Sequence, residues 1–428
     1  MQSNNSPAAR RLAATPIYLI ISGGIGFFFA LIASINMIYQ FETVGLSPLQ
    51  LVLVGTLLET VCFLGEVPTG IVADLYSRRL SIIIGFFLIG VGFILEGLVP
   101  TFAAVLATQV IWGIGVTFTS GATEAWITDE VGEAAAAPLF LRGTQLSQLG
   151  SLLGTFASVA LASVRLNLPI VIGGALIVGL ALFLALLMPE NGFHPTPQPE
   201  RNTFQKMGGT FIAGARVVRA SAILLTILAI ILFRGGASEA FDRLWQPHFL
   251  TSFPFPALGN LDNLFWFGLI IAAAKLLTIG TSAIVERRVN TASQRGAAGT
   301  ILFLNAVQLI AVVGLGLATN FSIAVIAFLI TTACRTTIGP VMTAWINGHL
   351  TTGTRATVLS MTSQSDALGQ IAGGPILGWI GSAYSIRAAI TASGILLAPA
   401  ILFILSALRR PADEGVVDEK TVAVTVEE

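Results

Sequence analysis

Charged residues are scarce in this chain: they make up 10% of its 428 residues, whereas about a quarter of an ordinary soluble domain is charged. Hydrophobic residues account for 54% of the sequence, which excludes a water-soluble globular domain. The 22 Lys and Arg residues are matched by 22 Asp and Glu residues, so no excess of positive charge is available for a nucleic-acid backbone. Nucleic acid is therefore not an expected partner.

Cysteine and histidine are also rare. Cys62 and Cys334 both lie inside apolar runs, and the three histidines are far apart, so we expect no disulfide framework, no metal site and no other cofactor. The sequence has no P-loop, no HExxH and no GxSxG motif. Direct use of ATP and a membrane-embedded enzyme are therefore not expected.

Long apolar runs, in contrast, are abundant. The hydrocarbon core of a bilayer is about 30 Å thick, and a helix needs about 20 mostly apolar residues to cross it. The alternating pattern of a membrane barrel is absent, so we predict an all-α membrane protein. Twelve segments are long enough to span: 16–39, 49–73, 80–98, 101–126, 143–164, 168–188, 221–246, 263–285, 297–318, 321–346, 356–380 and 386–408.

The positions of Lys and Arg predict the orientation of these spans. If the N-terminus is cytoplasmic, sixteen of these residues fall on the cytoplasmic side, two on the opposite side and four within spans. Cytoplasmic loops carry the excess of positive charge in membrane proteins. We therefore expect a multi-pass plasma membrane protein, the lipid bilayer as its surroundings, and both termini in the cytoplasm.

The longest polar stretch, 189–220, divides the spans into two groups of six. We predict a cytoplasmic N-terminus over 1–15, a first six-helix bundle over 16–188, a cytoplasmic linker over 189–220, a second bundle over 221–408 and a cytoplasmic tail over 409–428. Matching strings support two six-helix pseudo-repeats: Ala-Trp-Ile ends spans four and ten, and Arg142 and Arg355 begin similar strings at the starts of spans five and eleven.

The end of the second span contains the string GIVADLYSRR over 70–79. It resembles the loop signature of the major facilitator superfamily, which Gly70, Asp74, Arg78 and Arg79 match. Leu75 and Ser77 depart from the pattern, where a basic residue and a glycine are usual. Together with the spans, the linker and the duplication, the resemblance covers the whole chain and implies the major facilitator fold.

Within the superfamily, the strings GEVPTGIVAD, EAWITDE and SEAFDRLWQPHFL resemble bacterial multidrug, macrolide or tetracycline efflux carriers. Gln109 departs from their pattern, because many drug and proton antiporters have an Arg there, four residues before a Gly. The resemblance implies a monomer in the bacterial inner membrane that exports lipophilic, cationic or zwitterionic small molecules by proton antiport with alternating access. Uptake or facilitated diffusion of a small polar nutrient on the same fold is the alternative.

Ionisable residues inside the spans mark functional sites, because a charge in hydrocarbon costs several kcal/mol unless it is paired or hydrated. Glu59 lies near mid-membrane and is the first candidate for a proton carrier. Glu66 follows two turns later on the same face. The alternative is that Glu59 has a structural partner, Lys275 or Arg335, and Arg335 and Asp366 are also expected to neutralise each other.

The seventh span reads RGGASEAFDRLWQ. Arg234, Ser238 and Asp242 share one face, which we expect to line the cavity, and the glycines after Arg234 are candidates for a helix break. Glu239 and Arg243 are expected to form a structural i,i+4 pair near the outer end, within reach of water.

Aromatic residues add a second expectation. Trp112 and nearby phenylalanines are candidates for an apolar cavity wall, whereas Trp126 and Trp345 stand at span ends and are expected to anchor the chain at the membrane interface.

The superfamily resemblance also implies a gate at the cytoplasmic face. Asp74 would bear on the start of the eleventh span and Arg355, and Arg78 would pair with Asp129 or Glu124. By the duplication, Glu286 and Arg142 would make the mirrored contact. Exposed pairs contribute at most about 1 kcal/mol each, so such a gate must be a network weak enough to open.

Overall fold

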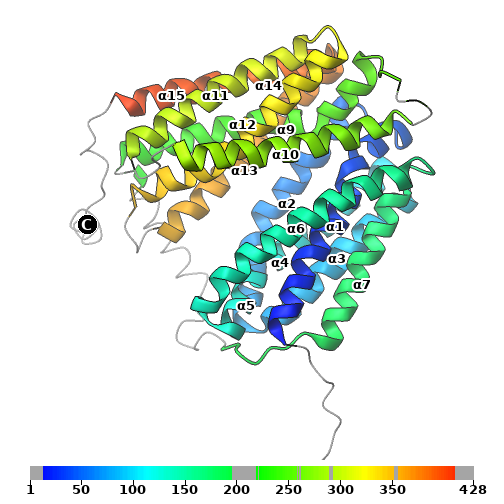
Figure 1. Ribbon diagram of the computed structural model, residues 1–428, viewed down its shortest axis with the longest axis vertical. Coiled ribbons are helices and arrows are strands. Elements are labelled where there is room, and N and C mark those ends of the chain that lie inside the picture. Colours follow the sequence, from blue (N-terminus) through cyan, green and yellow to red (C-terminus); the bar gives the residue numbers. More distant parts are fainter. Residues whose placement is uncertain are drawn as a thin grey trace, which may run out of the picture. The chain divides into compact units, whose positions relative to one another are not determined.

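The computed structural model describes residues 13–194, 218–219, 221–257, 259, 262–288, 293–350 and 355–409. Every regular element in these ranges is a helix, which confirms the all-α prediction (Figure 1). The elements are α1 (Ala14–Ile38), the π-helix η1 (Tyr39–Thr43), α2 (Pro48–Leu75), α3 (Arg78–Leu98), α4 (Phe102–Thr119), α5 (Ala122–Val131), α6 (Glu133–Ala162), α7 (Leu168–Leu187), α9 (Ala222–Ser252), α10 (Leu264–Arg288), α11 (Gln294–Leu317), α12 (Phe321–Asn347), α13 (Arg355–Ala383), α14 (Ile386–Leu396) and α15 (Ala398–Leu408).

Ten helical segments of the described chain are long and apolar enough to cross a membrane. Helices α6 and α13 occupy the predicted fifth and eleventh spans but are not among these ten, because polar side chains such as Gln145 and Asp366 interrupt their apolar runs. The chain is therefore a multi-pass membrane protein, and the count of twelve spans stays a prediction.

Three predicted spans differ from the observed helices: two are divided and one begins earlier. The fourth span is divided into α4 and α5 at Gly121, whose φ of +69° lies in the left-handed region that favours glycine. The last span is divided at Leu397 into α14 and α15. Helix α6 begins at Glu133, ten residues before the predicted start, so Arg142 lies inside this helix and not at its beginning.

The chain forms two compact units. Unit 1 contains residues 1–45 and 60–201, and unit 2 contains residues 46–59 and 202–428. The first part of α2, up to Glu59, therefore groups with unit 2. Most of the predicted linker and the terminal segments lie outside the described residues, so the predicted domain limits stay predictions.

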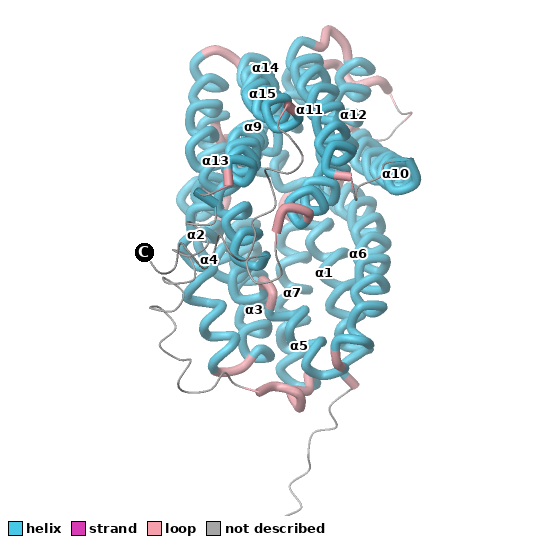
Figure 2. The backbone as a smooth tube through the Cα atoms, turned by 90° about the vertical axis from the view of Figure 1, so that its left-hand side faces the viewer, coloured by secondary structure: helices cyan, strands magenta, loops and turns pink. Residues whose placement is uncertain are grey.

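The two units share a pattern of helix pairs (Figures 1 and 2). In unit 1, α1 packs on α6 and α7, and α3 packs on α4 and α7. In unit 2, α9 packs on α13 and α14, and α11 packs on α12 and α14. The same four pairings recur in the same chain order, as duplicated sequence strings at corresponding helices would predict.

Glycines bring one helix pair of each unit into close contact. In unit 1, a Cβ atom at Gly154 of α6 would overlap the backbone oxygen of Phe27 in α1. In unit 2, a Cβ atom at Gly369 of α13 would overlap the backbone oxygen of Leu232 in α9, and one at Gly373 would lie 2.6 Å from the Cα atom of Gly236. Small residues at these positions allow the helix backbones to approach each other.

Each unit has its own apolar core, and each core contains one tryptophan that we expected at the membrane interface. Trp126 is 1% exposed and donates a hydrogen bond from Nε1 to the backbone oxygen of Pro189 (2.8 Å). Trp345 is 2% exposed in the core of unit 2. The interface-anchor prediction is wrong for both, because tertiary packing covers these helix ends.

Candidate functional site

Unit 2 gathers its intramembrane charges around α9. Arg335 of α12 forms two hydrogen bonds with the carboxylate of Asp242, from Nη1 at 2.5 Å and from Nη2 at 2.7 Å. We expected a direct pair of Arg335 with Asp366, but Asp366 is only attracted by Arg335 from a distance and accepts a hydrogen bond of 2.9 Å from the side chain of Gln370. This correction follows from helix packing, because α12 contacts α9, which carries Asp242.

A second ion pair lies within α9 itself. The Nε of Arg243 is 3.0 Å from the Oε1 of Glu239, as the i,i+4 spacing predicts. The expected access to water is wrong: the Glu239 side chain is 3% exposed and that of Arg243 12%. Both groups pack against Gly55 of α2, where even a Cβ atom would overlap the Glu239 carboxylate.

Glu59 lies one helical turn after Gly55 on α2, at the edge of this cluster. Its carboxylate interacts electrostatically with Glu239, Asp366 and Arg243. The ion pairs of this region join Arg335 to Asp242 and Arg243 to Glu239. The alternative partner Arg335 is therefore engaged elsewhere, while Lys275 lies half-buried on α10.

Arg234, Ser238 and Asp242, the face of α9 that we expected to line the cavity, contact different neighbours. Arg234 donates from Nη1 to the side-chain oxygens of Asn305 and Gln308 on α11, the latter at 3.3 Å, and the Ser238 hydroxyl donates to the backbone oxygen of Gly235 (2.9 Å). The predicted helix break is absent, because α9 is continuous from Ala222 to Ser252. The glycines after Arg234 serve the contact with α13 instead.

Three other predicted residues of the binding site lie in unit 1. Glu66 is exposed on α2. Gln109 is fully buried, and its Nε2 lies 3.4 Å from the backbone oxygen of Val105. The ring of Trp112 packs against Phe93, with 4.9 Å between the ring centroids. Gln109 is thus packed inside the bundle, and Trp112 is half-buried.

A buried hydrogen-bond network joins η1 to α3 in unit 1, and the sequence did not predict it. Glu96 is fully buried, and its Oε1 accepts a hydrogen bond of 2.7 Å from Nε2 of Gln40. The hydroxyl of Tyr39 donates to the backbone oxygen of Glu96, also at 2.7 Å. The intramembrane acid is evident in the sequence, but the π-helical turn that brings Gln40 to it is not.

The motif that resembles the superfamily signature ends in an ion-pair network. Arg78 pairs with Asp129 of α5, one of its two predicted partners, and lies 4.0 Å from Asp74. The neighbouring Arg79 donates from Nη2 to the backbone oxygen of Ala185 (2.6 Å). A Cβ atom at Gly70 would meet no atom within 4 Å, so packing does not require a glycine there.

Glu190, which we did not single out from the sequence, completes this network. Its carboxylate accepts hydrogen bonds from the hydroxyl of Ser77 (2.7 Å) and from the backbone N–H of Arg79 (2.9 Å). Its place just after α7 gave no local signal of this role. The remaining predicted gate residues have exposed side chains: Glu124 and Arg142 in unit 1, and Glu286 and Arg355 in unit 2.

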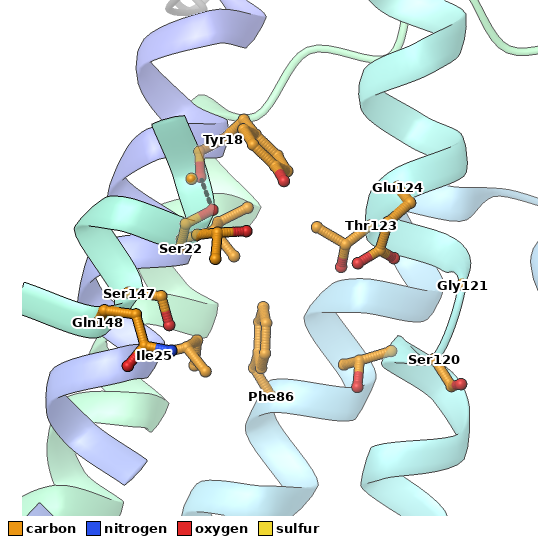
Figure 3. A pocket seen from close by; sticks show the side chains of 14 residues that line it. Tyr18, Ser22, Ile25, Phe86, Ser120, Gly121, Thr123, Glu124, Ser147 and Gln148 are labelled. Carbon is orange, nitrogen blue, oxygen red and sulfur yellow. Dashed lines mark hydrogen bonds between the residues drawn. The ribbon is translucent and has the colours of Figure 1, made fainter. Parts of the chain in front are cut away.

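Unit 1 also contains a cavity of about 590 Å³ (Figure 3). Its wall is formed by α1, α3, α4, α5 and α6, and the break between α4 and α5 at Gly121 borders it. Glu124, a predicted partner of Arg78, lies on this wall. The sequence did not reveal the cavity, because its polar residues are distributed over several helices. The lining residues are Tyr18, Ile21, Ser22, Ile25, Phe86, Thr119, Ser120, Gly121, Thr123, Glu124, Gly143, Thr144, Ser147 and Gln148.

Comparison with known proteins supports the fold. No family model matches the chain. The Bacillus subtilis (strain 168) protein named MFS-type transporter YxaM is 24% identical over 382 residues, which cover 88% of this chain and 92% of YxaM. A solved bacterial homologue of the human lysosomal transporter Spinster matches with a TM-score of 0.72 at 15% identity, covering 92% of this chain and 96% of that one. The chain has the fold of a major facilitator superfamily transporter.

Other solved transporters share this major facilitator fold. The peptide transporter POT in complex with sulfate matches with a TM-score of 0.72 at 14% identity, covering 94% of this chain and 95% of that one. The nucleoside transporter NupG matches with a TM-score of 0.66 at 14% identity, covering 92% and 100% of the two chains. Proteins with this fold thus move different classes of small molecules, and the substrate depends on the residues of each site.

Proposed function

We propose that this major-facilitator-type protein is a monomeric secondary active transporter of the bacterial inner membrane. It exports cationic or zwitterionic compounds, lipophilic ones among them, by proton antiport with alternating access. The observation that carries the proposal is the position of Glu59 beside the charged residues Glu239, Asp242 and Arg243 of α9. The two ion pairs of that cluster use Glu239 and Asp242, while Glu59 and Asp366 lie outside them.

The cost of charge in a membrane supports this proposal. Arg335 and Asp242 compensate each other, as do Arg243 and Glu239. A further carboxylate in hydrocarbon must take up a proton, become hydrated or bind a cation. Glu59 can therefore alternate between a protonated state and a state that attracts a cationic substrate, which is the requirement for antiport.

Transport of a small polar solute is the second candidate. The cavity of unit 1 favours it, because hydroxyl and amide groups account for much of its lining. Trp112, expected to form part of an apolar cavity wall, packs against Phe93 and is not among the residues that line this cavity. The two candidates differ in substrate and direction, and both use the same fold.

A transport screen in proteoliposomes tests the proposal. The purified protein is reconstituted, a pH gradient is imposed, and lipophilic cationic dyes and small polar amines are assayed in parallel. We expect accumulation of at least one cationic compound against its gradient, and its loss when a protonophore collapses the pH gradient. Gradient-independent equilibration of every compound would contradict antiport, and selective uptake of a polar solute would favour the second candidate.

We further propose that the network of Arg78, Asp129 and Asp74 is part of the inner gate. The predicted orientation places the loop between α2 and α3 in the cytoplasm, where a gate must open and close. The side chain of Arg78 is 21% exposed and that of Asp129 27%, so water screens this pair only in part. The ion pair between Arg78 and Asp129 is strong enough to bias a conformational equilibrium and weak enough to break in each transport cycle.

Arg78→Gln is expected to lower turnover about fivefold, because a partly exposed ion pair contributes about 1 kcal/mol. Asp74→Asn should lower turnover in the same direction, and both variants should leave substrate affinity unchanged. The exchange Arg78→Asp with Asp129→Arg should restore part of the rate. Arg165→Gln, an exposed arginine between α6 and α7, is the matched control. Equal turnover of Arg78→Gln and Arg165→Gln would refute the gate.

A further inference from the structure

We propose that the cavity of unit 1 binds a small protonated amine that also carries hydroxyl or amide groups. This inference rests on the proposed transport function and names the class of molecule that this cavity accepts. Five helices contribute to its wall, and the volume of about 590 Å³ lies within the usual range of small-molecule sites.

The polar groups of the wall face one another across the cavity. Figure 3 shows Tyr18 and Ser22 of α1 opposite Thr123 and Glu124 of α5, with Phe86 between them. Ser147 and Gln148 of α6 lie on the α1 side. A ligand in this space would therefore meet hydrogen-bonding groups on both sides and the aromatic rings of Tyr18 and Phe86.

The absence of a side chain at Gly143 of α6 leaves space for Tyr18 and Ser22 of α1. A Cβ atom at Gly143 would lie 2.8 Å from both the Cε1 atom of Tyr18 and the hydroxyl oxygen of Ser22. Any larger residue there would push against both side chains. Tyr18 is 7% exposed, so its position depends on this packing rather than on solvent.

Hydroxyl groups determine which ligands the cavity can hold. The hydroxyls of Ser22, Thr119 and Thr144 each donate to a backbone oxygen of their own helix at 2.9 Å. Their oxygens still have acceptor capacity, which suits a ligand that brings N–H and O–H donors. A purely apolar ligand would leave the acceptor capacity of these oxygens unused and would bind more weakly for that reason.

The charge of the wall adds a preference for cations. Glu124 is the single ionisable carboxylate among the lining residues, and none of them is Lys, Arg or His. Glu124 lies in the first turn of α5, directly after the helix break at Gly121, so the break places its carboxylate at the cavity. An ammonium group paired with Glu124 would form a charge-assisted hydrogen bond, whereas an anion would meet repulsion.

Equilibrium binding to the full-length protein in nanodiscs tests the proposal without any proton gradient. The probes are glucosamine and serinol as hydroxylated amines, glucose as a neutral polyol and tetraphenylphosphonium as an apolar cation. We expect glucosamine or serinol to bind at least tenfold more tightly than glucose, and tetraphenylphosphonium not to compete. Failure of both amines to bind, or displacement of them by tetraphenylphosphonium, would overturn the assignment.

Two variants locate the binding in the cavity. Glu124→Gln should weaken amine binding about tenfold and leave the weak glucose binding unchanged, because only the charged partner is removed. Thr123→Val should weaken amines and glucose together. Glu133→Gln, an exposed acid in the first turn of α6 outside the cavity wall, is the matched control. Equal amine affinities of Glu124→Gln and Glu133→Gln would overturn the proposal.

Failure of the transport proposal gives a different pattern. If no compound moves with the pH gradient but amine binding still depends on Glu124, proton antiport is wrong and the binding site stands. If gradient-driven transport occurs with a cation whose binding is unaffected by Glu124→Gln and Thr123→Val, antiport stands and this cavity is not its substrate site.

Discussion

Glu59→Gln is expected to reduce transport driven by a pH gradient at least a hundredfold, while the protein still folds and inserts. Glutamine has the size of a protonated glutamate but cannot release a proton, so the variant is held in one of the two states that antiport requires. Binding of substrate without a gradient should remain measurable. The readout is the initial rate of substrate accumulation in proteoliposomes with and without the imposed pH gradient.

Two comparisons make this result specific to Glu59. Glu42→Gln changes an exposed acid of η1 by the same chemistry and should leave the driven rate unchanged. Glu66→Gln tests the second predicted carrier, which is exposed on the same helix. A normal driven rate in Glu59→Gln would eliminate this residue as the proton carrier, and a loss confined to Glu66→Gln would transfer the role.

Breaking the Glu239–Arg243 pair should cause the largest loss of stability. Arg243→Met leaves the carboxylate of Glu239, whose side chain is 3% exposed, without its charged partner. Removing one partner of a buried ion pair costs about 3–5 kcal/mol, because the other charge stays buried and uncompensated. The free energy of unfolding in detergent micelles should fall by about that amount.

The more exposed pair of unit 2 is the matched comparison. The side chains of Arg335 and Asp242 are 33% and 41% exposed, so Asp242→Asn should cost less than Arg243→Met. The double variant Glu239→Gln with Arg243→Met should recover most of the stability that Arg243→Met loses, because it removes both buried charges. Equal losses for Arg243→Met and Asp242→Asn would show that burial does not govern the cost of these charges.

Local sequence patterns were reliable where the interaction is itself local. Residues four apart on a helix face each other whatever surrounds them, and this spacing predicted the contact between Glu239 and Arg243. The signature over 70–79 led to Arg78 and to Asp129 as one of two partners, a contact that the structure contains. Glu190 completes the same network from the end of α7, and no spacing pointed to it.

Local spacing did not predict which residues of different helices are in contact. Arg335 has acids on two neighbouring spans within plausible reach, and the choice of Asp242 over Asp366 depends on which helix α12 packs against. The glycines after Arg234 suit a helix break and a close helix contact equally well in sequence terms. In the structure these glycines make a close contact with α13, and α9 is continuous through them.

The amino-acid sequence alone was sufficient to predict the class of protein, its apolar helices and its superfamily resemblance. The reason is that each residue in lipid needs an apolar side chain and a hydrogen-bonded backbone, whatever its distant neighbours are. Which intramembrane charges meet, and where polar groups line a cavity, depended on how the helices pack. Ion pairs such as Arg335–Asp242, and walls that place Tyr18 opposite Glu124, join residues far apart in the chain. Such contacts arise only from the way in which side chains of different helices fill space together.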